Sequence, residues 1–306
     1  MAHVNVDQYI TTAQTAARVQ RLNQAVLDLE VLPVIGGSGS GKRAFLEWWW
    51  QGGCADTEFA GDYPINSHEI LLVRARHPGS SASVVSDVLT GLEVALKELE
   101  RANMNGELPQ PLMNPRTLRT QGQLSSLMRH TIKPLMDKLN PQAIVMLEAH
   151  YLDTPALHDL IELYAPTRRT SLRRPERGLI LCGNTETTEK VATPFRKVLK
   201  TTGFTRAALP DAMVYAPLAD RTEFAQIITR LVRQNLQAVP AEDLPMKEIA
   251  ARFSEWTDKE WLLIRTLAYI ADRCLGKQRG DEPRQFTRNV LECIEQTWVK
   301  RTKGTR

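Results

Sequence analysis

The stretch IGGSGSGKRAF, residues 35–45, has the residue types and the spacing of a phosphate-binding loop. Gly36 is followed by four residues and then by Gly41 and Lys42, which is the GxxxxGK pattern. Glycines let the backbone turn tightly and point its N–H groups at an anion, while the lysine adds a positive charge. The alternative is a Gly/Ser-rich turn that arose by chance. The pattern predicts that ATP binds through Gly36, Gly37, Ser38, Gly39, Ser40, Gly41, Lys42 and the adjacent Arg43.

Both protein groups that usually anchor Mg²⁺ beside such a loop are replaced. The motif normally continues with Ser or Thr, but Arg43 follows Lys42. An acidic strand end normally supplies an aspartate, but IVMLEAH (144–150) has Leu147 in its place and retains Glu148. A guanidinium can supply part of the missing charge, although it cannot repeat the coordination geometry of the metal. We therefore expect ATP binding with no metal site made of protein ligands, and slow or absent hydrolysis. The alternative is that Arg43 fills the pocket and nothing binds.

Four further polar residues have places that suit a nucleotide site. Asn184 ends the apolar run GLILCGN, where it could orient water between strand ends. Arg206 precedes the last expected strand, and an arginine there can reach the pocket of a neighbouring subunit. Arg284 and Arg288 lie near an expected helix start and could close over the phosphates. The alternatives are a helix cap for Asn184 and solvent-exposed surface positions for the arginines. With Glu148, Asn184 and Arg206 form the candidate catalytic set.

Apolar runs alternate with amphipathic segments up to about residue 220, which is typical of a parallel sheet flanked by helices. After that point the sequence indicates helices alone. We expect an α/β nucleotide-binding domain at 1–220, which opens with a helical segment at 1–30, and a helical domain at 221–306. The composition, 42% apolar and 24% charged, is ordinary for a soluble globular protein.

The sequence shows no sign of membrane insertion or secretion. No stretch approaches the roughly 18 apolar residues of a spanning helix, and the N-terminus lacks a signal-peptide pattern. His150 and His158 do not form a metal pair. The cysteines form no CxxC pair, so we expect reduced thiols in a cytoplasmic protein at Cys54, Cys182, Cys274 and Cys293.

Positive charge is concentrated in two segments, although the net charge is only +4. The segment TRRTSLRRPER (167–177) contains five arginines, and the tail VKRTKGTR (299–306) contains four basic residues. The alternatives are a solvated loop and a frayed end. If the chain binds nucleic acid, the first segment is the stronger candidate, through Arg168, Arg169, Arg173 and Arg174.

The order of these motifs resembles that of the AAA+ ATPases of the TniB/TnsC group, which regulate DNA transposition. The resemblance rests on GGSGSGKR, VMLEAHYL, LILCGN, TGFTR and GDEPRQFTRNVLE, in that order over roughly residues 20–300. It implies a P-loop AAA+ core with a C-terminal helical lid. Arg43 and Leu147 depart from the pattern of the family.

By this resemblance, Glu148 is the water-activating carboxylate, Asn184 the first sensor, and Arg206 the arginine finger. Either Arg284 or Arg288 is the second sensor. The implied partners are double-stranded DNA, further copies of the chain in a ring or filament, a transposase and a target-selection protein. Segment 167–177 is implied to face the central channel and contact DNA.

Two other functions remain open. One is a scaffold with this fold that recruits proteins and uses no nucleotide. The other is an active AAA+ ATPase in another role, such as DNA loading or secretion. The replaced magnesium anchors disfavour an active ATPase, and the basic segment favours the transposition regulator over the scaffold.

Replacing Arg173 and Arg174 together by alanine is expected to lower affinity for duplex DNA and to flatten its salt dependence. Each lost phosphate contact should reduce the slope of log affinity against log salt by about 0.9. Fluorescence anisotropy over a salt series measures both quantities. No change in either would count against this segment as a DNA contact.

Overall fold

The computed structural model describes residues 9–75, 80–102, 128–165, 175–184, 197, 212–215, 221–257, 261–276 and 283–303. The contacts divide the chain into two units. The helical unit comprises Met1–Thr15, Ser38–Ala44 and Ala216–Arg306, and the α/β unit comprises Ala16–Gly37 and Phe45–Tyr215. The domain boundary at residue 220 remains a prediction.

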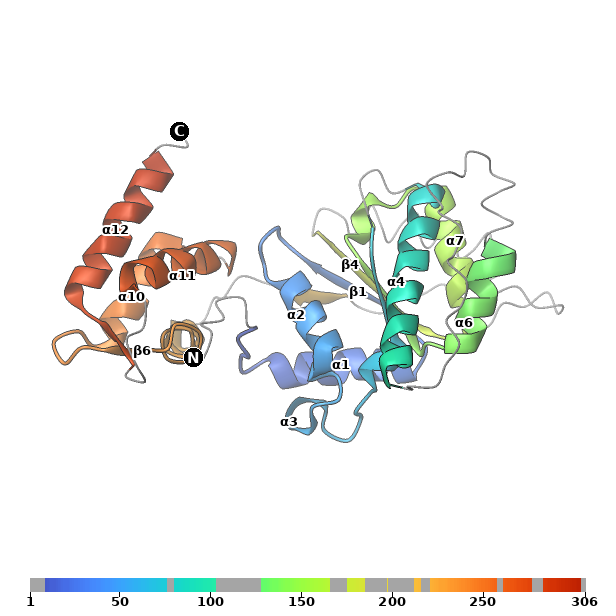
Figure 1. Cartoon of the computed structure of the whole chain (residues 1–306), viewed down its shortest axis with the longest axis horizontal. Helices are drawn as coiled ribbons and strands as arrows, with labels where there is room; N and C mark the ends of the chain where they lie inside the picture. The colour runs from blue at the N-terminus through green and yellow to red at the C-terminus, as the bar shows by residue number, and fades with distance from the viewer. Residues whose placement is uncertain are drawn as a thin grey trace. The chain divides into compact units, whose positions relative to one another are not determined.

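A five-stranded parallel sheet forms the centre of the α/β unit (Figure 1), as the sequence predicts. Its spatial order is β2-β3-β4-β1-β5, so β4 lies between β1 and β3. The strands are nearly continuous apolar runs because both faces of the sheet are covered by helices. Their bounds are β1 (Val31–Gly36), β2 (Ile70–Arg74), β3 (Ala143–Leu147), β4 (Gly178–Asn184) and β5 (Met213–Tyr215).

Figure 1 shows α4, α6 and α7 on one side of the sheet and α1 and α2 on the other. Alternate strand residues, among them Leu71, Ile144 and Leu179, pack against the first group in one buried core. The helices before residue 165 are α1 (Thr15–Leu27), α2 (Lys42–Trp48), α3 (Thr57–Ala60), α4 (Ser81–Ala102), α6 (Lys133–Leu139) and α7 (Thr154–Tyr164). The short helical turns are η1 (Trp49–Gly53), η2 (Ser67–Glu69), η4 (Met128–Ile132) and η5 (Ala149–Tyr151).

The helix that follows the phosphate loop is held by a buried polar cluster. The indole Nε1 of Trp49 donates to Asn23 Oδ1 at 2.8 Å. The amide of Asn23 donates to the carbonyls of Cys54, at 2.9 Å, and Tyr63, at 2.7 Å. Every polar atom of the Asn23 side chain thus has a partner, which is what a buried amide requires. The cluster ties α1 to the C-terminal end of the helical run that begins at Lys42.

Residues 9–14 of the expected helical segment 1–30 are not helical, and α1 begins at Thr15, where two threonines cap it. Thr12 N–H donates to Thr15 Oγ1 at 2.7 Å, and Gln14 N–H donates to Thr12 Oγ1 at 3.3 Å. These bonds satisfy amides that a helix leaves without partners at its start. Before the cap, Ile10 packs into the core of the helical unit, and Arg230 donates to Thr11 Oγ1 at 2.8 Å.

The helical unit packs around a second apolar core. Its elements are α9 (Arg221–Arg230), η6 (Leu231–Asn235), α10 (Met246–Thr257), α11 (Trp261–Leu275) and α12 (Arg288–Lys303), with two strands, β6 (Ala238–Pro240) and β7 (Arg284–Phe286). The expectation of helices alone after residue 220 is therefore wrong at these two strands, which pair in parallel. Strands of three residues are too short to show the alternation of apolar and polar residues by which a strand is recognised in a sequence. None of the described helices is both long and apolar enough to cross a membrane.

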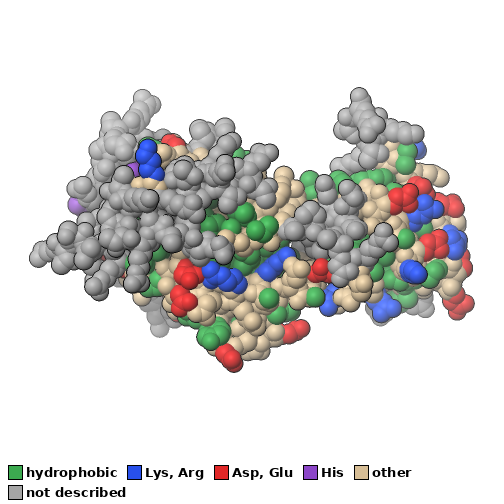
Figure 2. All heavy atoms as spheres, turned by 180° about the vertical axis from the view of Figure 1, so that it is seen from behind, with side chains coloured by type: hydrophobic (Ala, Val, Ile, Leu, Met, Phe, Trp, Pro, Cys, Tyr) green, Lys and Arg blue, Asp and Glu red, His purple; other side chains and the backbone are tan. Residues whose placement is uncertain are grey.

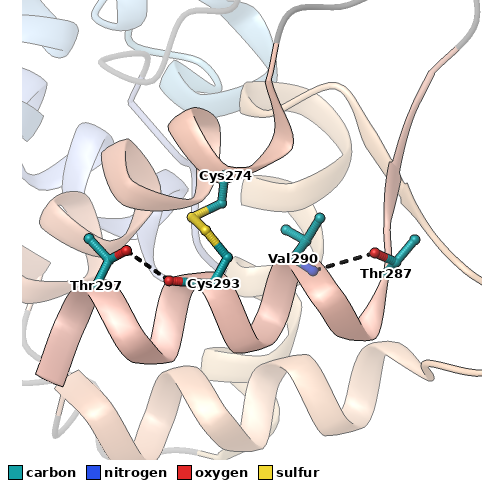
Figure 3. The surroundings of a disulfide bond; sticks show 5 residues. All are labelled: Cys274, Thr287, Val290, Cys293 and Thr297. Atoms are coloured by element: carbon teal, nitrogen blue, oxygen red, sulfur yellow. Dashed lines mark hydrogen bonds between the residues drawn. A yellow bond between two sulfur atoms is a disulfide. The ribbon is translucent and has the colours of Figure 1, made fainter.

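The structure also corrects the expectation of four reduced thiols. Cys274 of α11 and Cys293 of α12 form a disulfide (Figure 3), with Cα atoms 6.1 Å apart. The packing of α11 on α12 brings together two cysteines that are 19 residues apart. Cys293 lies at the surface. Cys54 and Cys182 are buried thiols that form no disulfide, and burial raises the pKa of Cys54 from 9.0 to about 11.

We expect the native, unreduced protein to show no fast-reacting thiol at pH 8. The thiolate is the nucleophile, and both free cysteines are buried, with Cys54 held protonated by its raised pKa. Ellman's reagent should titrate two thiols after unfolding and four after unfolding with reductant. Cys274→Ser is the control, because it should release Cys293 as one fast-reacting surface thiol. Two fast thiols in the native protein would contradict the disulfide.

Candidate functional site

The phosphate loop begins where β1 ends, between two other strand ends. Gly36 is the last residue of β1 and is in register with Asn184 of β4 and Tyr215 of β5. Within the loop, Gly39 has φ 75° and Gly41 has φ 86°. Residues with side chains rarely adopt these values, so the turn requires glycine at both positions. Lys42 is then the first residue of α2.

The loop contains a buried hydroxyl that suits an anionic ligand. Ser40 is 9% exposed, and its Oγ has no hydrogen-bond partner among the described residues. A buried polar group left in this way costs about 1–3 kcal/mol, which a phosphate oxygen would offset. Lys42, at 7% exposed, places a cation two residues away. The glycine turn, the hydroxyl and the cation together fit a phosphate group.

The acidic strand end has an unusual backbone. Leu147 closes β3 at 2% exposed, and its carbonyl accepts a hydrogen bond from Ala75 N–H at 2.9 Å. Glu148 follows with φ 57° and ψ 34°, in the left-handed region that side chains disfavour. Such conformations persist where the surrounding structure holds them, and they are frequent at functional sites. Here the bend starts η5, which turns the chain back beside the end of β4.

The turn places a histidine between Glu148 and Asn184. Nδ1 of His150 lies 3.7 Å from Glu148 Oε2, and its Nε2 lies 3.5 Å from Asn184 Nδ2. The structure therefore brings these two predicted site residues to opposite sides of one imidazole ring. From the sequence, His150 was considered only as a metal ligand, and its position between Glu148 and Asn184 was not predicted. The signal that could have found it is the two-residue spacing from Glu148, followed by the polar end of the next strand.

Comparison with known proteins bears on the fold. The sequence matches no protein-family model and no curated protein. Among solved structures, the chain is similar to the Walker-type ATPase paby2304 of Pyrococcus abyssi, with a TM-score of 0.57 and 13% sequence identity. The match covers 100% of this chain and 75% of that one. At this identity the similarity is evidence for the fold alone.

The fold is that of a P-loop ATPase. The parallel sheet, its strand order and the glycine turn after β1 agree with this class. In this fold, the carboxyl ends of the strands form the edge at which ligands bind.

The residues at this P-loop site do not fit a magnesium ion held by protein ligands. Arg43 is the second residue of α2, where the motif normally has a hydroxyl, and Leu147 is buried and apolar. No group of three or more His, Cys, Asp or Glu side chains within the described ranges could hold a metal ion. Glu148 is the one acidic residue left at the end of β3.

Arg284 lies inside the helical unit and donates to three residues of that unit. It is 8% exposed and donates to Leu236 O, at 3.0 Å from Nε, and to Gly276 O at 3.0 Å. It also forms an ion pair with Asp272 at 2.7 Å. These bonds fix β7 to the ends of η6 and α11. Contact with a phosphate would require Arg284 to leave them, so its second-sensor role remains a prediction.

Arg288 is exposed at the start of α12 and pairs with acidic residues of the same unit. It binds both carboxylate oxygens of Glu248, at 2.8 and 3.2 Å, and lies 3.4 Å from Asp243. The hydrogen bond and charge of Glu248 raise the pKa of Arg288. Its second-sensor role also remains a prediction.

The other predicted arginines lie outside the described residues: Arg168, Arg169, Arg173, Arg174 and Arg206. The fifth arginine of segment 167–177, Arg177, is described and is buried at 3% exposed. It donates to Leu163 O at 3.0 Å, and burial lowers its pKa. It therefore supports the start of β4, and only four arginines of the segment remain candidates for DNA contact.

Restoring both magnesium anchors with Arg43→Thr and Leu147→Asp is expected to raise ATP turnover at least tenfold, while neither change alone does so. Both groups would have to hold the same ion, and each factor of ten requires about 1.4 kcal/mol of transition-state stabilisation. Phosphate release is the measurement. Arg43→Thr with Leu147→Asn is the matched control, because it adds a side chain of the same shape without the charge. Full activity in either single variant would show that the two positions do not share an ion.

Proposed function

We propose that this protein is an ATP-binding AAA+ regulator of DNA transposition. It assembles as a ring or filament on target DNA and links a target-selection protein to the transposase, with slow or absent hydrolysis. The observation that carries the nucleotide part is the phosphate cradle, with its buried Ser40 hydroxyl and Lys42. The name of the Pyrococcus neighbour, a Walker-type ATPase, agrees with a nucleotide ligand.

Binding without rapid turnover follows from which groups are present. Glycine N–H groups, Ser40 and Lys42 can hold phosphates in the ground state. Arg43 can add charge beside them, but a guanidinium does not bridge two phosphates in the octahedral geometry of a metal. Glu148 can polarise water, yet without the metal the charge that develops in the transition state is poorly stabilised. Nucleotide then acts as a switch for assembly.

The DNA part of the proposal rests on the motif order and on segment 167–177. Four arginines in seven residues suit contacts to the DNA backbone, which position a protein without reading sequence. The helical unit offers a different surface. On the face shown in Figure 2, its described basic and acidic side chains lie interspersed. A surface of mixed sign is a poor DNA-binding surface, so the proposal assigns the contacts to the arginine segment.

A second candidate is a scaffold that uses no nucleotide. The position of Arg43 favours it, because this half-buried side chain follows Lys42 directly and could occupy the phosphate position itself. An active ATPase in another DNA-related role has less support, since only Glu148 of the usual metal-linked acidic pair is retained.

Isothermal titration calorimetry with ATP should show binding both with Mg²⁺ and in the presence of EDTA. Affinity in the two conditions is expected to agree within about threefold, because the proposal gives the metal no protein ligand that would couple it to nucleotide binding. Lys42→Ala should abolish the heat, and Lys133→Ala, in α6, is the control for the loss of one lysine. Flat titrations of the unchanged protein in both conditions would refute nucleotide binding. The scaffold that uses no nucleotide would then be the supported function.

Electron microscopy with duplex DNA, with and without ATP, separates the remaining alternatives. The proposal expects rings or filaments on DNA that form only with nucleotide. Particles that form equally without DNA and without nucleotide would support the scaffold and overturn the proposal.

A further inference from the structure

The His150 ring lies in a confined position between two strand ends. Its side chain is 12% exposed and packs on Tyr151, with ring centroids 4.1 Å apart. The η5 turn fixes its direction, since Tyr151 N–H donates to Glu148 O at 3.0 Å and Leu152 N–H donates to Ala149 O at 3.2 Å. Each ring nitrogen therefore faces one neighbour, Nε2 at hydrogen-bond distance and Nδ1 at a longer separation.

The chemistry of these neighbours favours one tautomer. A neutral imidazole has one N–H donor and one acceptor nitrogen. Asn184 presents its Nδ2 amide, a donor, to His150 Nε2, so this nitrogen has to be the acceptor. The proton then lies on Nδ1, which faces the Glu148 carboxylate at 3.7 Å, a separation that allows electrostatic attraction but is longer than a hydrogen bond. In this form the ring is attracted to both neighbours at once.

We propose that His150 is a positioning residue whose ring links the amide of Asn184 to the carboxylate of Glu148. This inference rests on the proposed nucleotide site and adds a means of regulation to it. Without nucleotide, the ring accepts a hydrogen bond from the Asn184 amide and attracts the Glu148 carboxylate across 3.7 Å. A γ-phosphate that takes the Asn184 amide removes one partner of the ring, and Glu148 is then released from the other side. The sensor and the carboxylate thus respond to nucleotide together.

Ordinary packing is the competing explanation. A ring that only fills space between η5 and the end of β4 could be replaced by an apolar side chain of similar size without coupling the two neighbours. His150→Leu removes donor and acceptor, and His150→Gln retains one of each. The matched control is His158→Leu, at an exposed position on α7.

The nucleotide-free protein tests the link directly. Long-range ¹⁵N spectra of protein with labelled histidine should show His150 as the Nδ1–H tautomer. Glu148→Gln and Asn184→Ala should each shift its resonances, and His158 should not respond to either change. A His150 ring in the Nε2–H form, or one insensitive to both variants, would overturn the link.

Nucleotide binding tests the coupling. In the protein that retains His150, Glu148→Gln and Asn184→Ala are each expected to change the ratio of ATP to ADP affinity. The change in the double variant should differ from the product of the two single changes by about threefold or more. With His150→Leu the two effects should become additive within about twofold, and His150→Gln should restore the coupling. Coupling that persists with His150→Leu would overturn the proposal.

The two proposals fail in different ways. If the unchanged protein binds neither ATP nor ADP, the proposed nucleotide function is refuted. The imidazole spectra of the nucleotide-free protein still test whether His150 links Asn184 to Glu148. If nucleotide binds but the spectra or the additivity test fail, His150 is a packing residue and the nucleotide function stands. Thermal melting of each variant identifies those that have lost their fold.

Discussion

The parallel pairing of β4 between β1 and β3 is the constraint on which the candidate site depends. Because all five strands run the same way, the loop after β1, the end of β4 and the turn after β3 emerge at one edge of the sheet. The register sets Gly36 beside Asn184, and Met146 beside Leu181 in the neighbouring pair. A shift of one residue in either pair would turn every side chain of that strand to the opposite face. The strands are buried on both faces, so the packing of individual side chains in the core, and no apolar/polar alternation, holds this register and places the polar ends.

Much of the α/β unit could be predicted from the sequence because its signals are local. Buried parallel strands are apolar runs, and glycines at 39 and 41 mark the positions where the turn needs positive φ. The replacement of the usual magnesium anchors by Arg43 and Leu147 is visible in the sequence spacing, and its effect on the metal stays a prediction. The left-handed backbone of Glu148 has no such signal, because a glutamate there runs against local preference.

The features that were missed depend on contacts between distant segments. The disulfide joins cysteines on two helices, and the strands β6 and β7 are only three residues each. The partners of Arg284, which come from the end of η6 and from α11, could not be read from the sequence either, and its predicted role as a phosphate ligand stays a prediction. A motif identifies a residue type at a position, whereas tertiary packing decides whether its side chain is directed to a ligand or to the interior.

The bond from Trp49 to Asn23 has a practical consequence for optical measurements. The indole is fully buried on the helical run that starts at Lys42, and its N–H is held by a side chain of α1. Indole emission depends strongly on such a partner and on contact with water. A displacement of this run against α1 would change the emission of Trp49. In a variant whose other five tryptophans are replaced, Trp49 would be the one indole fluorophore, 13 residues from Gly36, and would report on the segment next to the loop.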